Sequence, residues 1–413
     1  MSAGSLRDRA VALRTVDPDE GGAEDLEAVR QLVGDARVVC LGESAHGVSE
    51  FFRFKDRVSR FLVDELGFSA FVQESGFAEG LAVDKWMRGG AGDLDQVATD
   101  GITWGFGRCP EMRAQLGWMR DRDMRRGEEV RFYGMDMPGS CANPVDAVRV
   151  CLQRLGRQRW AGNPAGDRKS PNDGESPKGR ELPDDGELLR LADLGDRFAA
   201  AANHAAMTSE QRSRFSGGLA ELVERAARSG DQVAHRCAWS AQQLDKQLGD
   251  GRYRREDVMA DTVRWILERE DRIVIGAHNA HVQRGRLVND APSLGALLAP
   301  VLGEQLVVIG TTRSSGRMPE MHPGEPPSFT MEDVGPPPDG TIDAVMDEVG
   351  LPLHFVDLHK VSKDKLGAAA AMCGQSRTLE LDVPSAFDGL VHIRHLTEIP
   401  EFWNYLQDAL ARS

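Results

Sequence analysis

The sequence predicts an α/β fold with a mainly parallel central sheet flanked by helices. Short apolar runs are followed by polar turns and then by segments with the periodicity of amphipathic helices. Strands that alternate with helices in this way form parallel sheets covered on both faces. The first unit has an apolar run at 37–41 and a helical pattern at 49–66, which Ser49 is expected to cap and Gly67 to end.

The same alternation continues along the chain. A helical stretch at 23–33 precedes the first strand, and further strands are expected where apolar runs end in polar turns, at 69–73, 130–134, 272–276 and 306–310. Two more strand-like runs lie at 353–356 and 390–393. A segment dense in Pro and Gly, 319–340, is expected to be a long loop near the ligand side.

Between 145 and 270 the strand pattern is absent, and helices are expected at 186–207, 209–229, 232–248 and 256–270. We expect a helical insertion that covers the carboxyl edge of the sheet of an α/β catalytic core, 1–144 and 271–413. Within the insertion, 161–185 is rich in Gly, Pro, Asp, Lys and Ser and predicts a flexible loop.

Composition limits the classes of function. The 413 residues include 50 Lys and Arg against 65 Asp and Glu, a net charge of −15, so nucleic acid is not an expected partner. The six cysteines are too sparse for a disulfide scaffold, and we find neither a signal segment nor a long apolar run. We expect a soluble cytoplasmic protein without a membrane partner; its oligomeric state is left open.

Ionisable side chains follow four of the predicted strands. Ligands of open α/β sheets bind beyond the carboxyl ends of the strands. We therefore expect six side chains to gather at one edge of the sheet, namely Glu43, His46, Glu74, Asp136, His278 and His281.

His46 is the candidate general base, because a neutral imidazole can take a proton from water near pH 7. Glu43, three residues earlier, can fix its tautomer. A hydrogen-bonded histidine in a structural turn is the competing interpretation. On the following helix Arg53 or, preferably, Lys55 could present a cation to the site.

The other strand-end residues are ambiguous when taken alone. Glu74 could support His46, receive a proton or bind a cation, and Asp136 is equally open. The spacing of His278 and His281 is only weak evidence for a metal site. Asn279 between them could donate a hydrogen bond to an oxyanion.

Patterns typical of covalent catalysis are missing from the sequence. There is no Gly-x-Ser-x-Gly elbow, no cysteine in a recognisable nucleophile setting and no phosphate-binding loop. Direct attack by water is therefore favoured over an acyl-enzyme.

Four segments in order carry a family resemblance: Leu-Gly-Glu-Ser-Ala-His-Gly at 41–47, Gly-Phe at 67–68 with Glu74, Phe-Tyr-Gly-Met-Asp-Met at 132–137 and Gly-Ala-His-Asn-Ala-His at 276–281. Together they resemble the erythromycin esterase family, which hydrolyses the lactone of macrolide antibiotics and is associated with antibiotic resistance. The resemblance implies that His46 is the essential base and that Glu43 and Glu74 are acidic site residues. It implies that His278 and His281 bind or polarise the carbonyl and leaving oxygens. Lys55 stands where the macrolide-resistance enzymes have Arg.

From these observations we expect a carboxylic ester hydrolase that acts on a small-molecule ester or lactone without a covalent intermediate. The resemblance implies that no cofactor is required. Two alternatives stay open: a metal-dependent hydrolase, and a tailoring or sequestering protein of an antibiotic gene cluster. The residues that could ligate a divalent ion are Glu43, His46, Glu74, His278 and His281.

Overall fold

The computed structural model describes residues 4–20, 22–162, 182–322, 324, 327–362, 366, 369–375 and 377–412, without the side chains of 4–5 and 157–162. Most of the predicted flexible loop, 163–181, lies outside the described residues.

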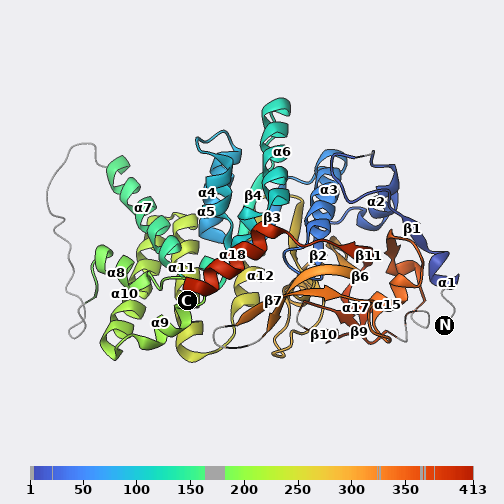
Figure 1. Cartoon of the computed structure of the whole chain (residues 1–413). Coiled ribbons are helices and arrows are strands. Elements are labelled where there is room, and N and C mark those ends of the chain that lie inside the picture. The colour runs from blue at the N-terminus through green and yellow to red at the C-terminus, as the bar shows by residue number, and fades with distance from the viewer. Residues whose placement is uncertain are drawn as a thin grey trace.

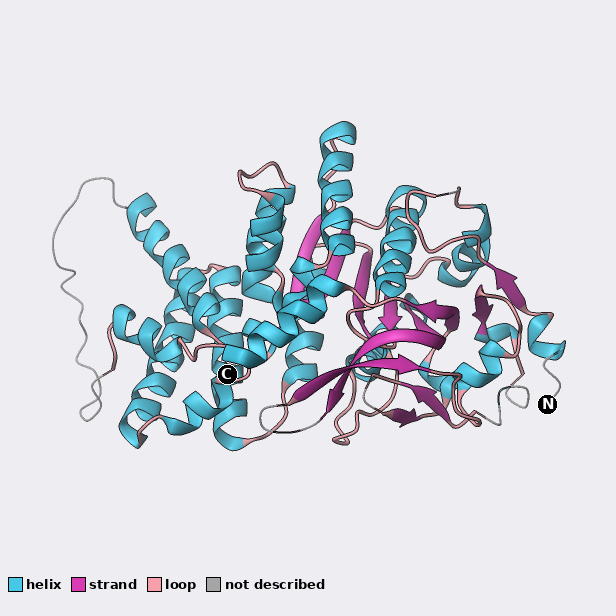
Figure 2. Ribbon diagram, viewed as in Figure 1, coloured by secondary structure: helices cyan, strands magenta, loops and turns pink. Residues whose placement is uncertain are grey.

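A central sheet runs through the molecule (Figures 1 and 2). Its strand order is β1–β8–β11–β6–β2–β5–β3–β4, and β7 pairs with β6. The pairs from β11 through β4 are parallel, whereas β1, β8 and β7 join the sheet antiparallel. The strands are β1 Ala10–Ala12, β2 Val38–Glu43, β3 Ala70–Gly76, β4 Arg131–Asp136, β5 Ile273–His278, β6 Leu306–His322, β7 Ser328–Val334, β8 Leu353–Asp357 and β11 Gly389–Leu396. The predicted mainly parallel α/β fold is confirmed, with a strand at each of the seven predicted runs.

Helices cover both faces of this sheet (Figure 2). Before the middle of the chain these are α1 Gly4–Arg7, α2 Glu27–Val33, α3 Ser49–Leu66, α4 Phe77–Met87, α5 Leu94–Gly101, α6 Pro110–Arg126 and α7 Val145–Gly162. Next come α8 Asp185–Ala192, α9 Ala200–Ala206, α10 Ser209–Ser229, α11 Gln232–Asp250 and α12 Arg255–Leu267. The rest are α13 Asn279–Val282, α14 Leu294–Leu302, α15 Ile342–Asp347, α17 Val383–Ala386 and α18 Pro400–Arg412. A small sheet pairs β9 Ala371–Cys373 with β10 Thr378–Glu380.

Side chains of β2 alternate between two hydrophobic cores. Val38 and Cys40 pack into one core, whereas Val39 and Leu41 pack into the other, and all four are fully buried. A strand buried on both faces has a continuous run of apolar residues, and the run at 37–41 predicts this strand for that reason.

Helix α3 has the predicted bounds, and it ends at Gly67, which adopts a φ of +71°. The expected cap is wrong, however. Val48 occupies the N-cap position without a side-chain cap, and the Ser49 hydroxyl instead donates to Glu111 Oε1 at 2.5 Å.

Two further expectations are corrected. The predicted loop 319–340 begins as a hairpin, because β6 continues through His322 and pairs with β7. An edge pairing tolerates Pro319, which lacks a donor. The predicted helix 186–207 is two helices, α8 and α9, separated by a turn at 193–199.

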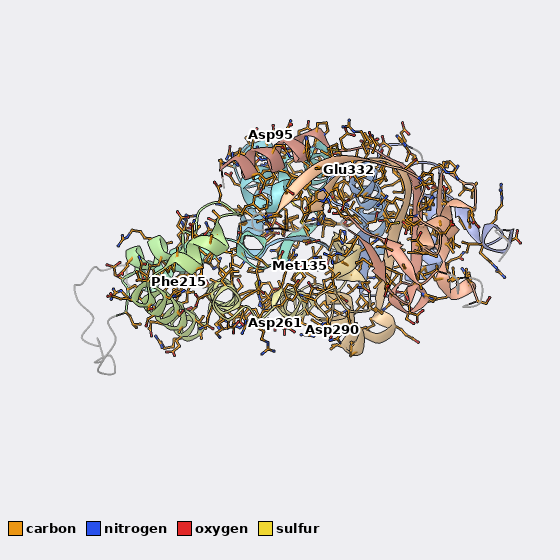
Figure 3. All side chains as sticks on the ribbon, turned by 60° about the horizontal axis from the view of Figure 1, so that its bottom comes forward. Asp95, Met135, Phe215, Asp261, Asp290 and Glu332 are labelled. Atoms are coloured by element: carbon orange, nitrogen blue, oxygen red, sulfur yellow. The ribbon has the colours of Figure 1, made fainter. Side chains whose placement is uncertain are left out.

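The helices from α7 to α11 extend from the β4 side of the sheet (Figure 1). Their core is continuous with that of the sheet, since Phe215 of α10 and Met135 of β4 belong to one cluster (both labelled in Figure 3). We propose that 145–270 is an insertion into a core of 1–144 and 271–413, because β5 returns to lie between β2 and β3. Within the described residues, every helix is too short or too polar to cross a membrane.

Candidate active site

The loop after β2 places His46 in contact with Glu43, which is buried and paired with Lys55. His46 Nδ1 lies 2.5 Å from Glu43 Oε1, and Lys55 Nζ donates to the other oxygen of Glu43. Burial alone would raise the pKa of Glu43, but Lys55 and His46 lower it to about 2. The ionised carboxylate accepts from Nδ1–H and so leaves Nε2 as the basic nitrogen of the neutral ring.

Two glycines allow this loop to fold tightly. A Cβ at Gly42 would lie 2.1 Å from Asn279 Oδ1, and one at Gly47, where φ is +70°, would meet Phe402 at 2.2 Å. The amide of Asn279 bonds to the backbone of Thr311 in both directions, which ties α13 to β6.

A second cluster forms where β3, β4 and α12 meet. Arg255, the first residue of α12, donates to Glu74 Oε1 at 2.8 Å and to Asp136 Oδ2 at 2.6 Å. His281 Nδ1 lies 2.7 Å from Glu256 Oε1, and its Nε2 lies 3.2 Å from Glu74 Oε1. All three carboxylates are buried.

The charges of this cluster favour an ionised Glu74 and a protonated His281. Burial opposes both charged forms, but Glu256 and Glu74 raise the pKa of His281 to about 10. His281 and Arg255 likewise hold the pKa of Glu74 well below its usual value. Arg255 Nη1 is also 3.2 Å from His281 Nε2. It could donate only to an unprotonated nitrogen, and the two carboxylates favour the imidazolium.

His278 lies between His46 and the cluster around Glu74, and its side chain is neutral. Its backbone N–H donates to Glu74 Oε2 at 2.8 Å, and its ring lies 5.0 Å from that of His46. The ring Nε2–H donates to the Ser44 carbonyl, while Nδ1 accepts from the Ala280 N–H. Burial, with the nearby His46, lowers the pKa of His278 to about 3. Both nitrogens are therefore engaged by the backbone.

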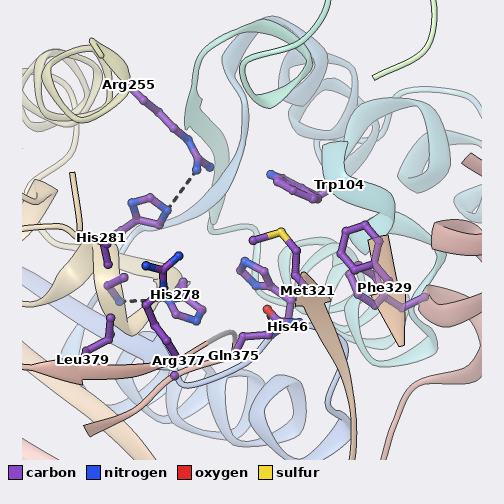
Figure 4. Close-up of a pocket in the computed structure, with 14 residues that line it drawn as sticks. His46, Trp104, Arg255, His278, His281, Met321, Phe329, Gln375, Arg377 and Leu379 are labelled. Carbon is purple, nitrogen blue, oxygen red and sulfur yellow. Dashed lines mark hydrogen bonds between the residues drawn. The ribbon is translucent and has the colours of Figure 1, made fainter. Parts of the chain in front are cut away.

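A cavity of about 250 Å³ opens onto these residues (Figure 4). Its polar wall includes His46, Arg255, His278 and His281, and its apolar wall includes Trp104, Met321, Phe329 and Phe402. Trp104 has a φ of +63° and lies under the Arg197 guanidinium, 3.3 Å from the ring centre. Because a bulky residue rarely adopts positive φ, the neighbours of Trp104 must hold it in place.

The structure gathers five of the predicted site residues around the cavity or directly behind it, namely His46, Glu43, Glu74, His278 and His281, and places Asp136 one contact further away through Arg255. Three predicted binding residues lie elsewhere. Lys55 is buried, with its Nζ over the ring of Phe52, and donates to Glu43. Asn279 is buried too, and its side-chain amide is bonded to the backbone of Thr311. Arg53 pairs with Asp17 at the surface.

In the part of the chain that the structure describes, His, Cys, Asp and Glu form no group of three or more suited to holding a metal ion. The carboxylates of Glu43 and Glu74 contact Lys55 and Arg255 instead.

Comparison with known proteins identifies the family. The model of the erythromycin esterase family matches residues 63–396, most of the chain. The chain belongs to the erythromycin esterase family. Among curated relatives, erythromycin esterase type II of Escherichia coli is 22% identical over 94% of this chain and 96% of that protein.

Solved structures of low identity share the fold of this family member. A Bacillus cereus protein matches with a TM-score of 0.76 and 19% identity over 96% of this chain and 97% of its own. The erythromycin esterase mutant EreC in its open conformation matches with a TM-score of 0.72 and 20% identity, over 94% of this chain and 98% of its own.

Sequence reasoning missed Arg255, the cation that connects the acids of this family member. One signal was available: a cation in the first turn of a helix is unfavourable beside the helix dipole, so it needs acidic partners. Trp104, Met321 and Phe329 carried no comparable signal, because lining a cavity depends on packing between distant segments.

Proposed function

We propose that this member of the erythromycin esterase family hydrolyses an ester or lactone bond of the macrolactone type by direct attack of water. Family membership supports hydrolase activity on a small molecule and is consistent with a role in antibiotic resistance. The observation that carries the proposal is the Glu43–His46 pair, which faces the same cavity as the cations Arg255 and His281.

In the proposed reaction His46 Nε2 takes a proton from water while the water oxygen attacks the carbonyl carbon. Collapse of the oxyanion intermediate then breaks the ester C–O bond, and the His46 imidazolium returns the proton to the leaving alkoxide. Glu43 orients the ring and stabilises the imidazolium that forms. Lys55 keeps Glu43 ionised, a role that its burial and its contact support. Of the two acids considered for orienting the base, Glu43 is therefore the one in contact with it.

Arg255 and the protonated His281 supply positive charge at the cavity wall. The developing oxyanion is stabilised by such fixed charge, and removal of one donor typically slows a reaction about 10²–10³-fold. Glu74, Asp136 and Glu256 act as positioning residues, because each contacts one of these cations. His278 positions His46 by ring packing, since both its nitrogens are bonded to the backbone.

The proposal is tested with His46→Asn and with the control His395→Asn, an exposed histidine. Erythromycin and a panel of lactones are incubated with each protein, and hydrolysis is detected by mass spectrometry as the gain of one water. We expect His46→Asn to lower kcat by about 10²–10⁴-fold, the usual contribution of a general base, with an unchanged circular dichroism spectrum. Near-normal turnover would overturn the role of His46.

The absence of a covalent intermediate needs a separate measurement. Rapidly quenched wild-type reactions are examined by mass spectrometry of the intact protein, and we expect no acyl adduct. An adduct that forms and decays at the turnover rate would contradict direct attack by water. Stoichiometric lactone binding without a mass gain would favour sequestration instead.

A further inference from the structure

A second cavity, of about 310 Å³, lies next to the active-site cavity. The two cavities share the wall residues Gly374, Gln375 and Arg377. Gln375 also connects this wall to the catalytic loop, since its Oε1 accepts from the His46 N–H at 3.2 Å while its Nε2 donates to the Pro319 carbonyl at 2.8 Å. A ligand that fills the second cavity is therefore separated from His46 by a single layer of residues.

Arg313 brings a buried cation to this second cavity. Its exposed fraction is 8%, and with the described residues its guanidinium makes one hydrogen bond, from Nη2 to the Gly374 carbonyl at 3.4 Å. Among the described residues Nε has no partner, and no carboxylate lies within ion-pair distance. The nearby carboxylate of Asp343 accepts instead from the backbone N–H groups of Arg313 and Cys373.

A buried cation without an acid partner is unusual, because desolvation of an unpaired charge is strongly unfavourable. Arg377 adds a second cation to the same lining, and the described part of the chain provides no hydrogen bond or ion pair to its side chain. Figure 4 shows Arg377 on the wall beside His278, where the side chain borders the active-site cavity as well.

One acid also lines the second cavity. Burial raises the pKa of Glu320 to about 7, although Arg313 opposes the shift. Near neutral pH its negative charge is partly lost, so that the two arginines dominate the charge of the lining. An ionised Glu320 would repel an anion in the second cavity. Replacement of Glu320 by a neutral residue should therefore strengthen anion binding there.

We infer that the second cavity is an anion subsite, formed by Arg313 and Arg377, for a carboxylate or phosphate group carried by the substrate. This inference rests on the proposed ester hydrolysis, which places the ester group of the substrate. The ester occupies the cavity of His46, and the anionic group reaches past the shared Arg377 to Arg313. Guanidinium groups suit both anions, because they donate paired hydrogen bonds to them.

Inorganic phosphate tests the site without catalysis. Calorimetric titration of the full chain compares the wild type with Arg313→Gln, Arg377→Gln and Glu320→Gln, and with Arg317→Gln as a control on the same strand. We expect saturable binding that weakens at least tenfold in either of the first two variants, tightens in Glu320→Gln and stays unchanged in Arg317→Gln. Arg317 pairs with Asp333 and Glu398 outside the cavity.

The site is refuted if wild-type protein does not bind phosphate, or if Arg377→Gln binds it as tightly as the wild type. Arg377 is exposed, so this variant remains informative if Arg313→Gln fails to fold.

A matched pair of esters tests whether the anion belongs to the substrate. The para-nitrophenyl monoester of glutarate carries a carboxylate where the pentanoate ester has a methyl group. We expect the wild type to prefer the glutarate ester, and Arg377→Gln to lower that preference in kcat/KM at least tenfold, mainly through KM. Phosphate binding together with an unchanged preference would overturn the assignment to the substrate. If neither ester nor any lactone is hydrolysed, the proposed function fails, while the phosphate titration still decides the anion site.

Discussion

Arg255 shows how much of the site depends on one side chain. It contacts Glu74, near the carboxyl end of β3, and Asp136, the last residue of β4, and its Nη1 lies 3.2 Å from His281 Nε2 on a third segment. All of these partners are buried. Removing one partner from a buried ionic group leaves uncompensated charge, which is far more destabilising than loss of a surface pair.

We therefore expect Arg255→Met to lower the free energy of unfolding by about 3–5 kcal/mol and kcat by about 10²–10³-fold. The neighbouring Arg254→Met is the control, because Arg254 pairs with the exposed Asp250 and its loss should change stability by about 0–1 kcal/mol. Urea denaturation and steady-state kinetics measure both effects. Equal, small effects of the two variants would contradict a central role for Arg255.

Helix α6 contains one glycine in its interior and is followed by another at its C-terminal end, and the two have opposite effects on stability. Gly117 lies inside the helix, where a Cβ would make an ordinary contact with Leu94 at 3.8 Å. Gly127 ends the same helix with a φ of +69°. Glycine is unfavourable at the first position and favourable at the second, because only the second requires left-handed backbone.

Replacement by alanine should therefore change the free energy of unfolding in opposite directions at Gly117 and at Gly127. We expect Gly117→Ala to raise the free energy of unfolding by about 0.5–1 kcal/mol. Gly127→Ala should lower it by about 1–2 kcal/mol. Thermal and urea unfolding of both variants decide the point, and the same sign for both changes would contradict it.

Across the whole molecule, buried neutral histidines oppose folding at acidic pH. His354 and His392 face each other across β8 and β11, with ring centres 5.2 Å apart, and neither is exposed. Burial lowers the pKa of His354 to about 4 and that of His392 to about 3, and each is about 6.5 in an unfolded chain. Below pH 6.5 the unfolded state therefore binds more protons than the folded state. The stability that the two neutral histidines allow is complete above pH 6.5, and it is lost as the pH falls towards 4 for His354 and towards 3 for His392.

Between pH 6 and 4 the free energy of unfolding falls with decreasing pH, because the unfolded state binds more protons than the folded state. We expect His354→Leu to lower this difference by up to one proton, which makes the slope shallower by up to about 1.4 kcal/mol per pH unit. The variant also removes a buried Nε2 that lacks a partner among the described residues. Urea denaturation at a series of pH values measures the slope, with His395→Asn as the exposed control. An unchanged slope in His354→Leu would show that other groups dominate acid unfolding.

Local patterns were sufficient for the parallel sheet, for helix α3 and for the position of the loop that carries His46. An apolar run such as 37–41 is dictated by burial on both faces, and residues that follow parallel strands meet at one edge whatever lies between them. The sequence therefore predicts that His46, Glu74 and His281 lie at one edge of the sheet, where the structure also places them.

Other features depend on contacts between segments far apart in the chain. Lys55 has the right charge and spacing for substrate binding, but its rotation on α3 directs it to Glu43. The hairpin of β6 and β7 depends on pairing that outweighs the local tendency of a Pro-rich segment to form a loop. The positions of Arg255 and Trp104 and the cavity at Arg313 depend on how α12, the 3₁₀ helix Thr103–Arg108 and the wall of Gly374, Gln375 and Arg377 pack together. Burial and ion pairing are determined by the neighbours that folding brings together.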